Sequence, residues 1–487
     1  MAVLTVIHRN KTSSVAFEGQ PLLDELLKSN GFFIPHPCAG RGLCKKCRVT
    51  VSGAVSEPTP AEELAGSRLS CQIRLLGDAT VTLNDAEDSV QITTDVLPTP
   101  DALCPMEGRL GAAIDVDTTT VALRLCELSS GRTVGEASAL NPQTAVSADV
   151  MGRIDAAMKG ELDLLRRQIL ECIGSLLKKA AGGRIDEVDS LSLTGNTTML
   201  YLLTGREPSS LARAPFEADC LFGKEERILS KKAWLSPCIN AFVGADVTCA
   251  VLVADMLSQS GTTLLCDIGT NGEMVLKKGD YLFVTSTAAG PAFEGAGISC
   301  GCGSIRGTVD RVWVENGTLK AHTVGEAPAV GICGSGLLDA VAAGLKLGLI
   351  DETGAMDADT LKVCEGVELI GRDIRAVQLA KAAISAGILT LLETSGTDID
   401  EIDTLYIAGG FGSHLDPKSA SAIGMIPTEL SDRVKVLGNA ALSGALATLL
   451  DTRNVSKLHE ICSSAVSVNL SGNPKFNENY VEQMLFC

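Results

Sequence analysis

The chain has 487 residues, which at roughly 150 residues per domain predicts about three domains. Hydrophobic residues make up 45% and charged residues 21% of the sequence, as in folded soluble proteins, so wholesale disorder is excluded. The formal net charge of −18 argues against nucleic acid and anionic membrane surfaces as partners, because both are themselves negatively charged.

Cysteine content and hydropathy indicate the cellular compartment of the protein. The 17 cysteines are spread over the whole length without a secretory signal, which favours a reducing, cytoplasmic location over a disulfide framework. The longest apolar stretch, residues 241–257, is interrupted by Asp246 and Asp255. We therefore expect no membrane-spanning helix.

The first 95 residues predict one small domain that binds a metal cluster. Residues 3–8 and 14–18 read as two strands of a hairpin, and leucines at helical spacing over 22–27 predict a helix that ends at Gly31. The following loop has a Cys-x5-Cys-x2-Cys pattern, and a fourth cysteine precedes the next apolar strand. Four thiolates, three of them on a glycine-bearing loop, are suited to an iron–sulfur cluster. The candidate ligands are Cys38, Cys44, Cys47 and Cys71.

A structural zinc site is the alternative for these four cysteines. Zinc sites usually carry two paired Cys-x2-4-Cys units, whereas Cys71 stands alone. The arrangement resembles the 2Fe-2S ferredoxins, and its spacing resembles their adrenal and bacterial type. That resemblance implies an α+β, ferredoxin-like (β-grasp) domain over residues 1–95. Prolines are frequent in residues 96–108, which predicts a linker.

The remaining chain uses one pattern twice. Residues 110–125 form an apolar run that reaches Asp115, turns on threonines and returns as a second apolar run, and residues 263–276 repeat this around Asp267. Such hairpin tips offer N–H and hydroxyl donors to phosphate oxygens, and an aspartate at the strand end can hold Mg²⁺. Each tip alone is equally consistent with an ordinary turn. The candidate phosphate-binding residues are Thr118, Thr119, Gly269, Thr270, Asn271 and Gly272.

A third element strengthens the nucleotide interpretation. The apolar run that starts at residue 403 ends in a Gly-Gly-x-Gly loop formed by Gly409, Gly410 and Gly412, where the backbone can approach an adenosine closely. Two phosphate-type hairpins followed by this loop resemble the superfamily of acetate and sugar kinases, heat-shock chaperones and actin. The resemblance implies an α/β, two-lobed actin-like or sugar-kinase-like ATPase, with lobes at 109–260 and 261–487. ATP and Mg²⁺ would lie between the lobes, with Asp115 and Asp267 as catalytic residues.

One residue departs from that superfamily's pattern. Asp117 stands where the first hairpin more usually has glycine. A further carboxylate beside phosphates repels them unless Mg²⁺ intervenes, so this tip departs further from the phosphate-binding pattern than the second tip does.

Four further stretches indicate one particular family within that superfamily. Residues 194–199, 288–296, 331–339 and 438–445 resemble signature stretches of the reductive activators of corrinoid proteins, and they add Gly334 and Ser335 to the candidate cofactor-binding residues. This family joins an N-terminal 2Fe-2S domain to an ATPase. The resemblance implies ATP-dependent transfer of one electron to the Co(II) of a corrinoid protein in a methyltransferase system. An external electron donor would reload the cluster, and a homodimer is compatible with the sequence.

Three other functions stay open on the sequence alone. The chain could be a small-molecule kinase with a redox domain, or a ferredoxin-tethered binding module without enzymatic activity. It could also activate another low-potential enzyme, as the activators of 2-hydroxyacyl-CoA dehydratases do. Those activators use a 4Fe-4S cluster between two subunits and have no N-terminal ferredoxin.

Overall fold

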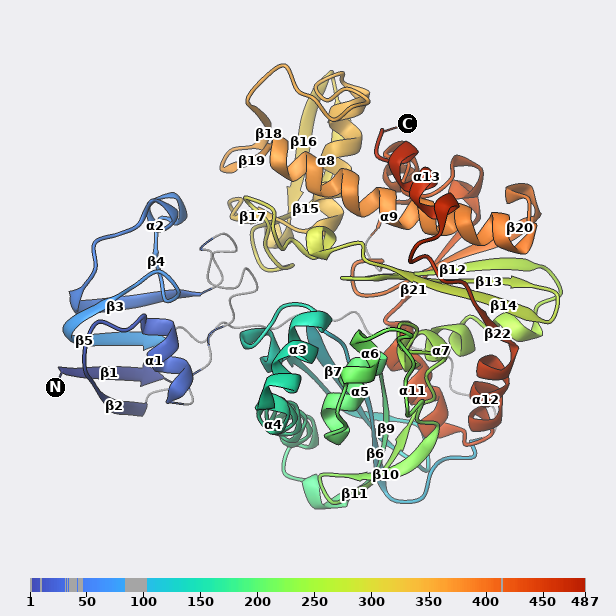
Figure 1. The fold of residues 1–487 in the computed structure, drawn as a ribbon, viewed down its shortest axis with the longest axis horizontal. Coiled ribbons are helices and arrows are strands. Elements are labelled where there is room, and N and C mark those ends of the chain that lie inside the picture. The colour runs from blue at the N-terminus through green and yellow to red at the C-terminus, as the bar shows by residue number, and fades with distance from the viewer. Residues whose placement is uncertain are drawn as a thin grey trace. The chain divides into compact units, whose positions relative to one another are not determined.

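The computed structural model describes residues 2–8, 11–30, 32, 34, 42, 47–83, 103–412 and 415–486. Cys38, Cys44 and most of the expected linker lie outside the described residues. The chain divides into two compact units, one of residues 1–89 with 142–153 and one of residues 90–141 with 154–487 (Figure 1).

The described part of the first unit is built on a mixed sheet. Its strands lie in the order β2-β1-β5-β3-β4, and β1 pairs with β5 in parallel while the other pairs are antiparallel. The expected hairpin and helix are confirmed, because β1 pairs with β2 and α1 contributes Leu23 and Leu27 to the core. The elements are β1 (Ala2–His8), β2 (Lys11–Phe17), α1 (Leu23–Ser29), β3 (Arg48–Val55), α2 (Pro60–Ala65), β4 (Arg68–Leu69) and β5 (Leu75–Leu83).

The second unit contains two sheets of the same topology. In each, an antiparallel run of strands continues into parallel strands, in the orders β8-β7-β6-β9-β11 and β14-β13-β12-β20-β21. The repeated pattern in the sequence is thus a repeated supersecondary unit. The first sheet comprises β6 (Leu110–Val116), β7 (Thr120–Glu127), β8 (Thr133–Leu140), β9 (Val188–Gly195), β10 (Lys224–Ile228) and β11 (Lys231–Leu235). The second comprises β12 (Thr262–Ile268), β13 (Gly272–Lys278), β14 (Tyr281–Thr287), β20 (Ile402–Ala408), β21 (Val434–Gly438) and β22 (Ala465–Ser467).

Two helices cross each other in the layer between the two sheets. Helix α11 (Ala440–Leu450) packs on the first sheet, and α7 (Ala245–Val253) packs on the second. Helix α11, from the second lobe, therefore covers the first sheet, and α7, from the first lobe, covers the second sheet. They cross so closely that a Cβ on Gly444 would lie 2.4 Å from Cβ of Cys249, so only glycine fits there.

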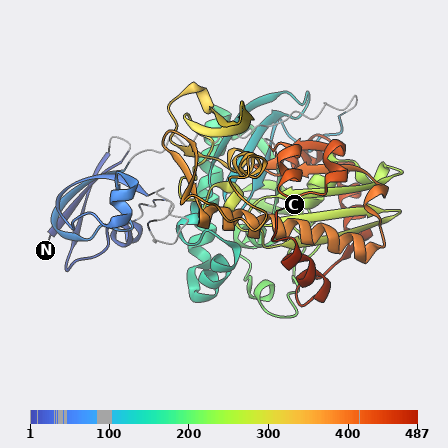
Figure 2. The ribbon, with the colours of Figure 1, turned by 90° about the horizontal axis from the view of Figure 1, so that it is seen from above.

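Two long helices cover the outer faces of the two sheets. Helix α4 (Leu162–Ala181) packs on β7 and β8, and α9 (Gly371–Ser395) packs on β13 and β14, beside which it runs in Figure 2. By length and hydropathy α9 could cross a membrane, but 78% of its most apolar stretch is buried inside the protein, as in a core helix.

The remaining elements complete the second unit around these layers. A small sheet of β15 (Thr308–Glu315), β16 (Thr318–Thr323) and β17 (Gly331–Ile332) packs against α8 (Gly334–Lys346). The pair β18 (Thr360–Cys364) and β19 (Val367–Ile370) precedes α9. The other helices of this unit are α5 (Thr197–Thr204), α6 (Ser209–Ala212), α10 (Pro417–Ala422), α12 (Asn454–Ser464) and α13 (Pro474–Glu482), and α3 (Val150–Ala156) spans the division between the two units.

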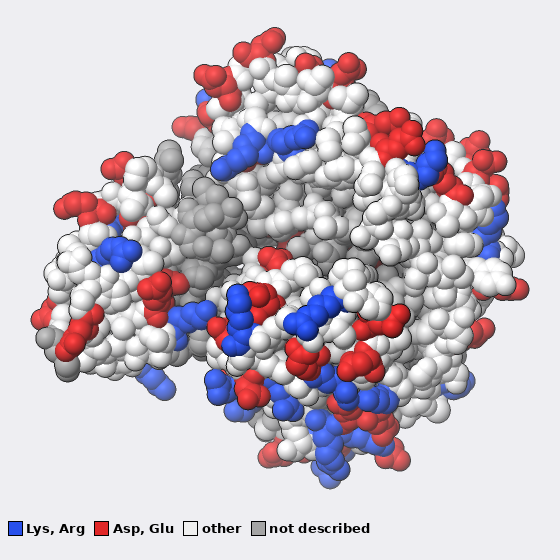
Figure 3. All heavy atoms as spheres, viewed as in Figure 1, with Lys and Arg blue, Asp and Glu red and all other residues white. Residues whose placement is uncertain are grey.

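Acidic and basic side chains are mixed on the visible surface. On the face drawn in Figure 3, lysine and arginine lie among aspartate and glutamate over both units and do not merge into one continuous basic area.

Candidate functional site

Asp115 and Asp267 occupy equivalent positions in the two sheets. Side chains alternate along a strand, so Asp115 lies on the face of β6 that also carries Ala113, which packs against α11. By the same alternation, Asp267 lies on the face of β12 that carries Leu265, which packs with α7. Both acids thus project from the two sheets toward the layer of crossing helices between them.

The first of these acids is buried with incomplete hydrogen bonding. Asp115 is 7% exposed, and its Oδ2 accepts a hydrogen bond of 3.2 Å from Nδ2 of Asn439, the residue that caps the N-terminus of α11. Its Oδ1 is buried and has no hydrogen-bond partner among the described residues. A buried carboxylate oxygen without a partner costs free energy, which a bound cation would offset.

Several other carboxyl groups surround Asp115 and Asp267. Burial, then the charges of Asp246 and Asp117, raises the pKa of Asp267 to about 8. Burial, then the charges of Asp117 and Asp246, raises the pKa of Asp115 well above its ordinary value. Burial raises the pKa of Asp246 to about 6, and burial with neighbouring acids raises that of Glu273 as well.

The charge balance of this pocket fits Mg²⁺. The residues that raise these pKa values are other carboxyl groups, and their charges repel one another where they are ionised. Carboxylate oxygens are the protein ligands that Mg²⁺ prefers, and a divalent cation would relieve the repulsion. The pocket would also tolerate phosphate groups only with such a cation present.

Hydroxyl and amide groups lie beside the acids at the two tips. Thr118 accepts a hydrogen bond of 2.9 Å from Nδ2 of Asn196, which also caps α5. Oγ1 of Thr119 donates to Oε2 of Glu294 at 2.7 Å, and Oγ1 of Thr270 donates to Oε1 of the same residue at 2.6 Å. Residues of both hairpin tips therefore meet at one side chain. The N–H of Gly269 donates to the carbonyl of Asn271 at 2.9 Å, which closes the second tip, and β13 begins at Gly272.

The glycine-rich loop is adjacent to the second tip. Gly409 follows β20 with φ +94°, and a Cβ there would lie 2.6 Å from Oδ1 of Asp267 and from the carbonyl oxygen of Ile268. A side chain at position 409 would therefore displace the acid. A Cβ on Gly410 would have no atom within 4 Å, and one on Gly412 would be directed toward the Ile407 side chain.

Gly334 and Ser335 form the first turn of α8, next to the same loop. A Cβ on Gly334 would clash with the carbonyl oxygen of Phe293, and Oγ of Ser335 donates to the carbonyl of Asp310 at 2.9 Å. The ring of Phe293 stacks on that of Phe411, within the loop, with centroids 4.9 Å apart. Helix α8 and the glycine-rich loop are thus held together through Phe293.

Two of the four predicted cluster ligands lie in the described part of the first unit. Cys47 and Cys71 are buried beside Leu69, and their Sγ atoms are 3.3 Å apart without a disulfide. The side-chain amide of Gln72 donates to Sγ of Cys71 over 3.6 Å. Two converging buried thiols with an N–H donor fit an iron–sulfur cluster. Cys38 and Cys44 lie outside the described residues.

We call the region of the two hairpin tips, the two acids and the glycine-rich loop the cleft. Several residues that lie there were not identified as candidate site residues from the sequence. Asn196, Glu294 and Asn439 each lie in a stretch that resembles the family's signatures, so the signal was present but no role could be assigned to single residues. Asp246 lies in the first turn of α7, and Glu273 follows the second tip directly. Neither has a motif of its own.

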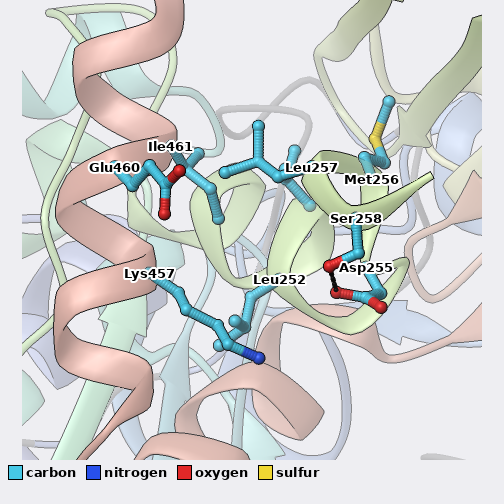
Figure 4. A pocket seen from close by; sticks show the side chains of 9 residues that line it. Leu252, Asp255, Met256, Leu257, Ser258, Lys457, Glu460 and Ile461 are labelled. Atoms are coloured by element: carbon cyan, nitrogen blue, oxygen red, sulfur yellow. Dashed lines mark hydrogen bonds between the residues drawn. The ribbon is translucent and has the colours of Figure 1, made fainter. Parts of the chain in front are cut away.

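A separate cavity lies away from this cleft. It has a volume of about 130 Å³ between the C-terminal end of α7 and α12, and Asp255 in its wall accepts a hydrogen bond of 2.8 Å from Ser258 (Figure 4). None of the predicted site residues lines it.

Models of known protein families match residues in both units. The model of the 2Fe-2S iron-sulfur cluster binding domain matches residues 6–76, that of the RACo middle region matches 110–259, and that of the C-terminal domain of RACo, the ASKHA domain, matches 261–487. ASKHA is the superfamily of acetate and sugar kinases, heat-shock proteins and actin. The predicted fold, with its iron–sulfur and ATPase domains, is confirmed.

Relatives and a solved structure cover most of the chain. The corrinoid activation enzyme RamQ of Eubacterium limosum is 33% identical over 420 residues, which are 77% of this chain and 70% of that protein. The Co(II) methylated amine-specific corrinoid protein reductase of Methanosarcina barkeri is 27% identical over 418 residues, 77% of each. The structure of the reductive activator for corrinoid,iron-sulfur protein is 26% identical with a TM-score of 0.74, and the match covers 99% of this chain and 98% of that one. With both units and their order shared, the chain belongs to the RACo and RamQ family of reductive activators of corrinoid proteins.

Proposed function

We propose that this protein is an ATP-dependent reductive activator that passes one electron to the Co(II) of a corrinoid protein. The product is Co(I), the form that accepts a methyl group in a methyltransferase system. One observation carries the proposal: a single chain joins an iron–sulfur domain to an ATPase fold in which two acid-bearing hairpins meet. The relatives named as a corrinoid activation enzyme and a Co(II) corrinoid protein reductase support it.

The four cysteines of the first unit would hold the 2Fe-2S cluster. When bound, this group supplies reversible one-electron transfer. Cys47 and Cys71 are buried together, which would keep water from part of the cluster. The N–H of Gln72 points at the Cys71 sulfur, where it would stabilise negative charge and raise the reduction potential.

The cleft residues would bind Mg-ATP. Asp115 and Asp267 would hold the cation and orient the attacking water, while Thr118, Thr119 and the backbone of 269–272 would bind phosphates. Gly409, Gly410 and Gly412 would seat the adenosine, and Gly334 and Ser335 would bind from the start of α8. The support for these roles is that the two tips, the acids and the glycine-rich loop come together in one place.

ATP is needed because the electron must move energetically uphill. Each 100 mV of unfavourable potential costs about 2.3 kcal/mol for one electron, so even a modest gap slows unassisted transfer. Coupling requires two states that bind the partner differently, since a nucleotide indifferent to both states shifts nothing. The two sheets, connected by the crossing helices α7 and α11, would supply those states.

The domain boundaries, the electron donor, the oligomeric state and the cellular location belong to the same proposal. Domain boundaries at 1–95, 96–108, 109–260 and 261–487 fit the placement of the sheets. An external donor would reload the cluster, a homodimer is compatible with the fold, and a reducing, cytoplasmic setting fits cysteines that form no disulfide among the described residues.

Phosphate release tests the proposal against the kinase alternative. Hydrolysis of Mg-ATP by the cluster-loaded protein should rise several-fold when a Co(II) corrinoid protein is added, with inorganic phosphate as the product. Formation of a phosphorylated sugar or carboxylate, detected by mass spectrometry, with no response to the corrinoid protein would favour a kinase instead.

A further inference from the structure

Glu294 connects the two hairpin tips, and no role has been assigned to it. It ends the short helix η5 (Pro291–Glu294) and accepts hydrogen bonds from Thr119 of the first tip at 2.7 Å and from Thr270 of the second at 2.6 Å. The two carboxylate oxygens are used separately, one for each threonine. Tips separated by about 150 residues in sequence are thus joined through one side chain.

The carboxylate occupies donors that phosphates would need. Both threonine hydroxyls are spent on Glu294, and a Cβ on Gly269 would lie 3.8 Å from its Oε1, which places this oxygen beside the backbone of the second tip. A negatively charged phosphate cannot share these donors with a carboxylate, because the two repel each other. Binding of a nucleotide through the two tips therefore requires Glu294 to leave.

Movement of Glu294 would be transmitted to the rest of the cleft. The preceding residue, Phe293, stacks on Phe411 of the glycine-rich loop with the two ring planes 12° apart, and its carbonyl oxygen lies against Gly334 at the start of α8. Close-packed interiors change between discrete arrangements and do not deform smoothly. A displaced η5 would accordingly shift the glycine-rich loop and α8.

We propose that Glu294 is a nucleotide-sensing clasp, a positioning residue that joins the two lobes in the absence of nucleotide and is displaced by its phosphates. The inference rests on the proposed function, because it assumes that the two tips bind ATP. Without nucleotide, the lobes are joined directly through Glu294. When the phosphates displace Glu294, the lobes are joined through the nucleotide, and this exchange switches the ATPase between two states.

Nucleotide affinity tests the clasp. We would measure the Kd of Mg-ADP and of a non-hydrolysable Mg-ATP analogue for wild type, Glu294→Gln and Glu294→Ala by calorimetry on the cluster-loaded protein. Both variants should bind about tenfold more tightly, which corresponds to about 1.4 kcal/mol, because no ionised carboxylate competes for the hydroxyls. Glu365→Ala, which removes an exposed glutamate between β18 and β19, is the matched control for net charge and should leave the Kd unchanged.

A double-mutant cycle with Thr119→Val separates the clasp from a merely structural role. If Glu294 acts through the Thr119 hydroxyl, the gain in affinity from Glu294→Ala should fall to less than half in the Thr119→Val background. An undiminished gain in that background, or unchanged or weaker binding in Glu294→Gln, would overturn the proposal.

The same measurements separate the clasp from the function on which it rests. Wild type that binds nucleotide with the expected shifts but never reduces a corrinoid protein would leave the clasp standing and remove the function. Failure of wild type and all variants to bind nucleotide would remove both.

Discussion

Replacing Asp267 by asparagine removes one charge from the acidic pocket while keeping the shape of the side chain. The pKa of this carboxyl is raised from 3.8 to about 8, first by burial and then by Asp246 and Asp117. Each pKa unit corresponds to about 1.4 kcal/mol, so the full penalty of ionising Asp267 in the folded protein would be about 6 kcal/mol. Its side chain is only partly buried, and screening by water reduces this to about 2 kcal/mol.

The sign of the pH dependence follows from the raised pKa. Below the ordinary value of 3.8 the carboxyl is protonated in both folded and unfolded chains, and Asp267 carries no penalty. As the pH rises toward about 8, the unfolded chain loses its proton first, so the folded wild type loses stability relative to Asp267→Asn. The variant should therefore melt at a higher temperature than wild type in Mg²⁺-free buffer, by a margin that grows up to about pH 8 and then stays constant.

Activity should change in the opposite direction. With Mg-ATP the wild-type carboxylate becomes a ligand, so Asp267→Asn should lose at least about 100-fold in ATP hydrolysis. Absorbance and iron content of the cluster should stay at wild-type values, because the substitution lies in the other unit. A variant that hydrolyses ATP at the wild-type rate, or whose melting temperature tracks wild type at every pH, would refute the account of this pocket.

Three further substitutions test the rest of the site. Gln72→Leu should lower the reduction potential of the cluster, because it removes the N–H donor to Sγ of Cys71, and an unchanged potential in a spectroelectrochemical titration would contradict this. Cys71→Ala should abolish the 2Fe-2S absorbance, whereas Cys172→Ala, whose thiol has its pKa raised to about 11 by burial, should keep it; equal iron contents would count against the ligand assignment. Gly409→Ala should weaken ATP binding at least about tenfold, since its Cβ would approach Oδ1 of Asp267 to 2.6 Å, and wild-type affinity would exclude the loop from the site.

The sequence predicts the hairpins well because their signals are local. An apolar run that ends in an acid and a turn of glycine or threonine specifies strand, tip and return strand within about 15 residues, and β6–β7 and β12–β13 follow that pattern. The two helices between the sheets also have a local signal, since both α7 and α11 are strongly apolar; α11 is buried along nearly its whole length and α7 over most of it.

Contacts across the cleft could not be predicted in this way. Asn439 reaches Asp115 across 324 positions of sequence, and Glu294 reaches Thr119 across 175, so each depends on how the two sheets meet. The same holds for the choice of sheet that α7 and α11 cover, which depends on packing between segments far apart in the chain. Resemblance to family signatures marked the stretches that contain Asn439 and Glu294, but only the fold showed what these side chains contact.

Reduction of cobalt is the decisive measurement of the proposed activity. Under anaerobic conditions, the reduced protein would be mixed with a Co(II) corrinoid protein and the visible spectrum followed for Co(I), with and without Mg-ATP. We expect Co(I) to form with wild type only when Mg-ATP is present, and not to form with Asp267→Asn. Co(I) formation at the same rate without nucleotide, or none with several corrinoid proteins while ATP is still consumed, would contradict this expectation.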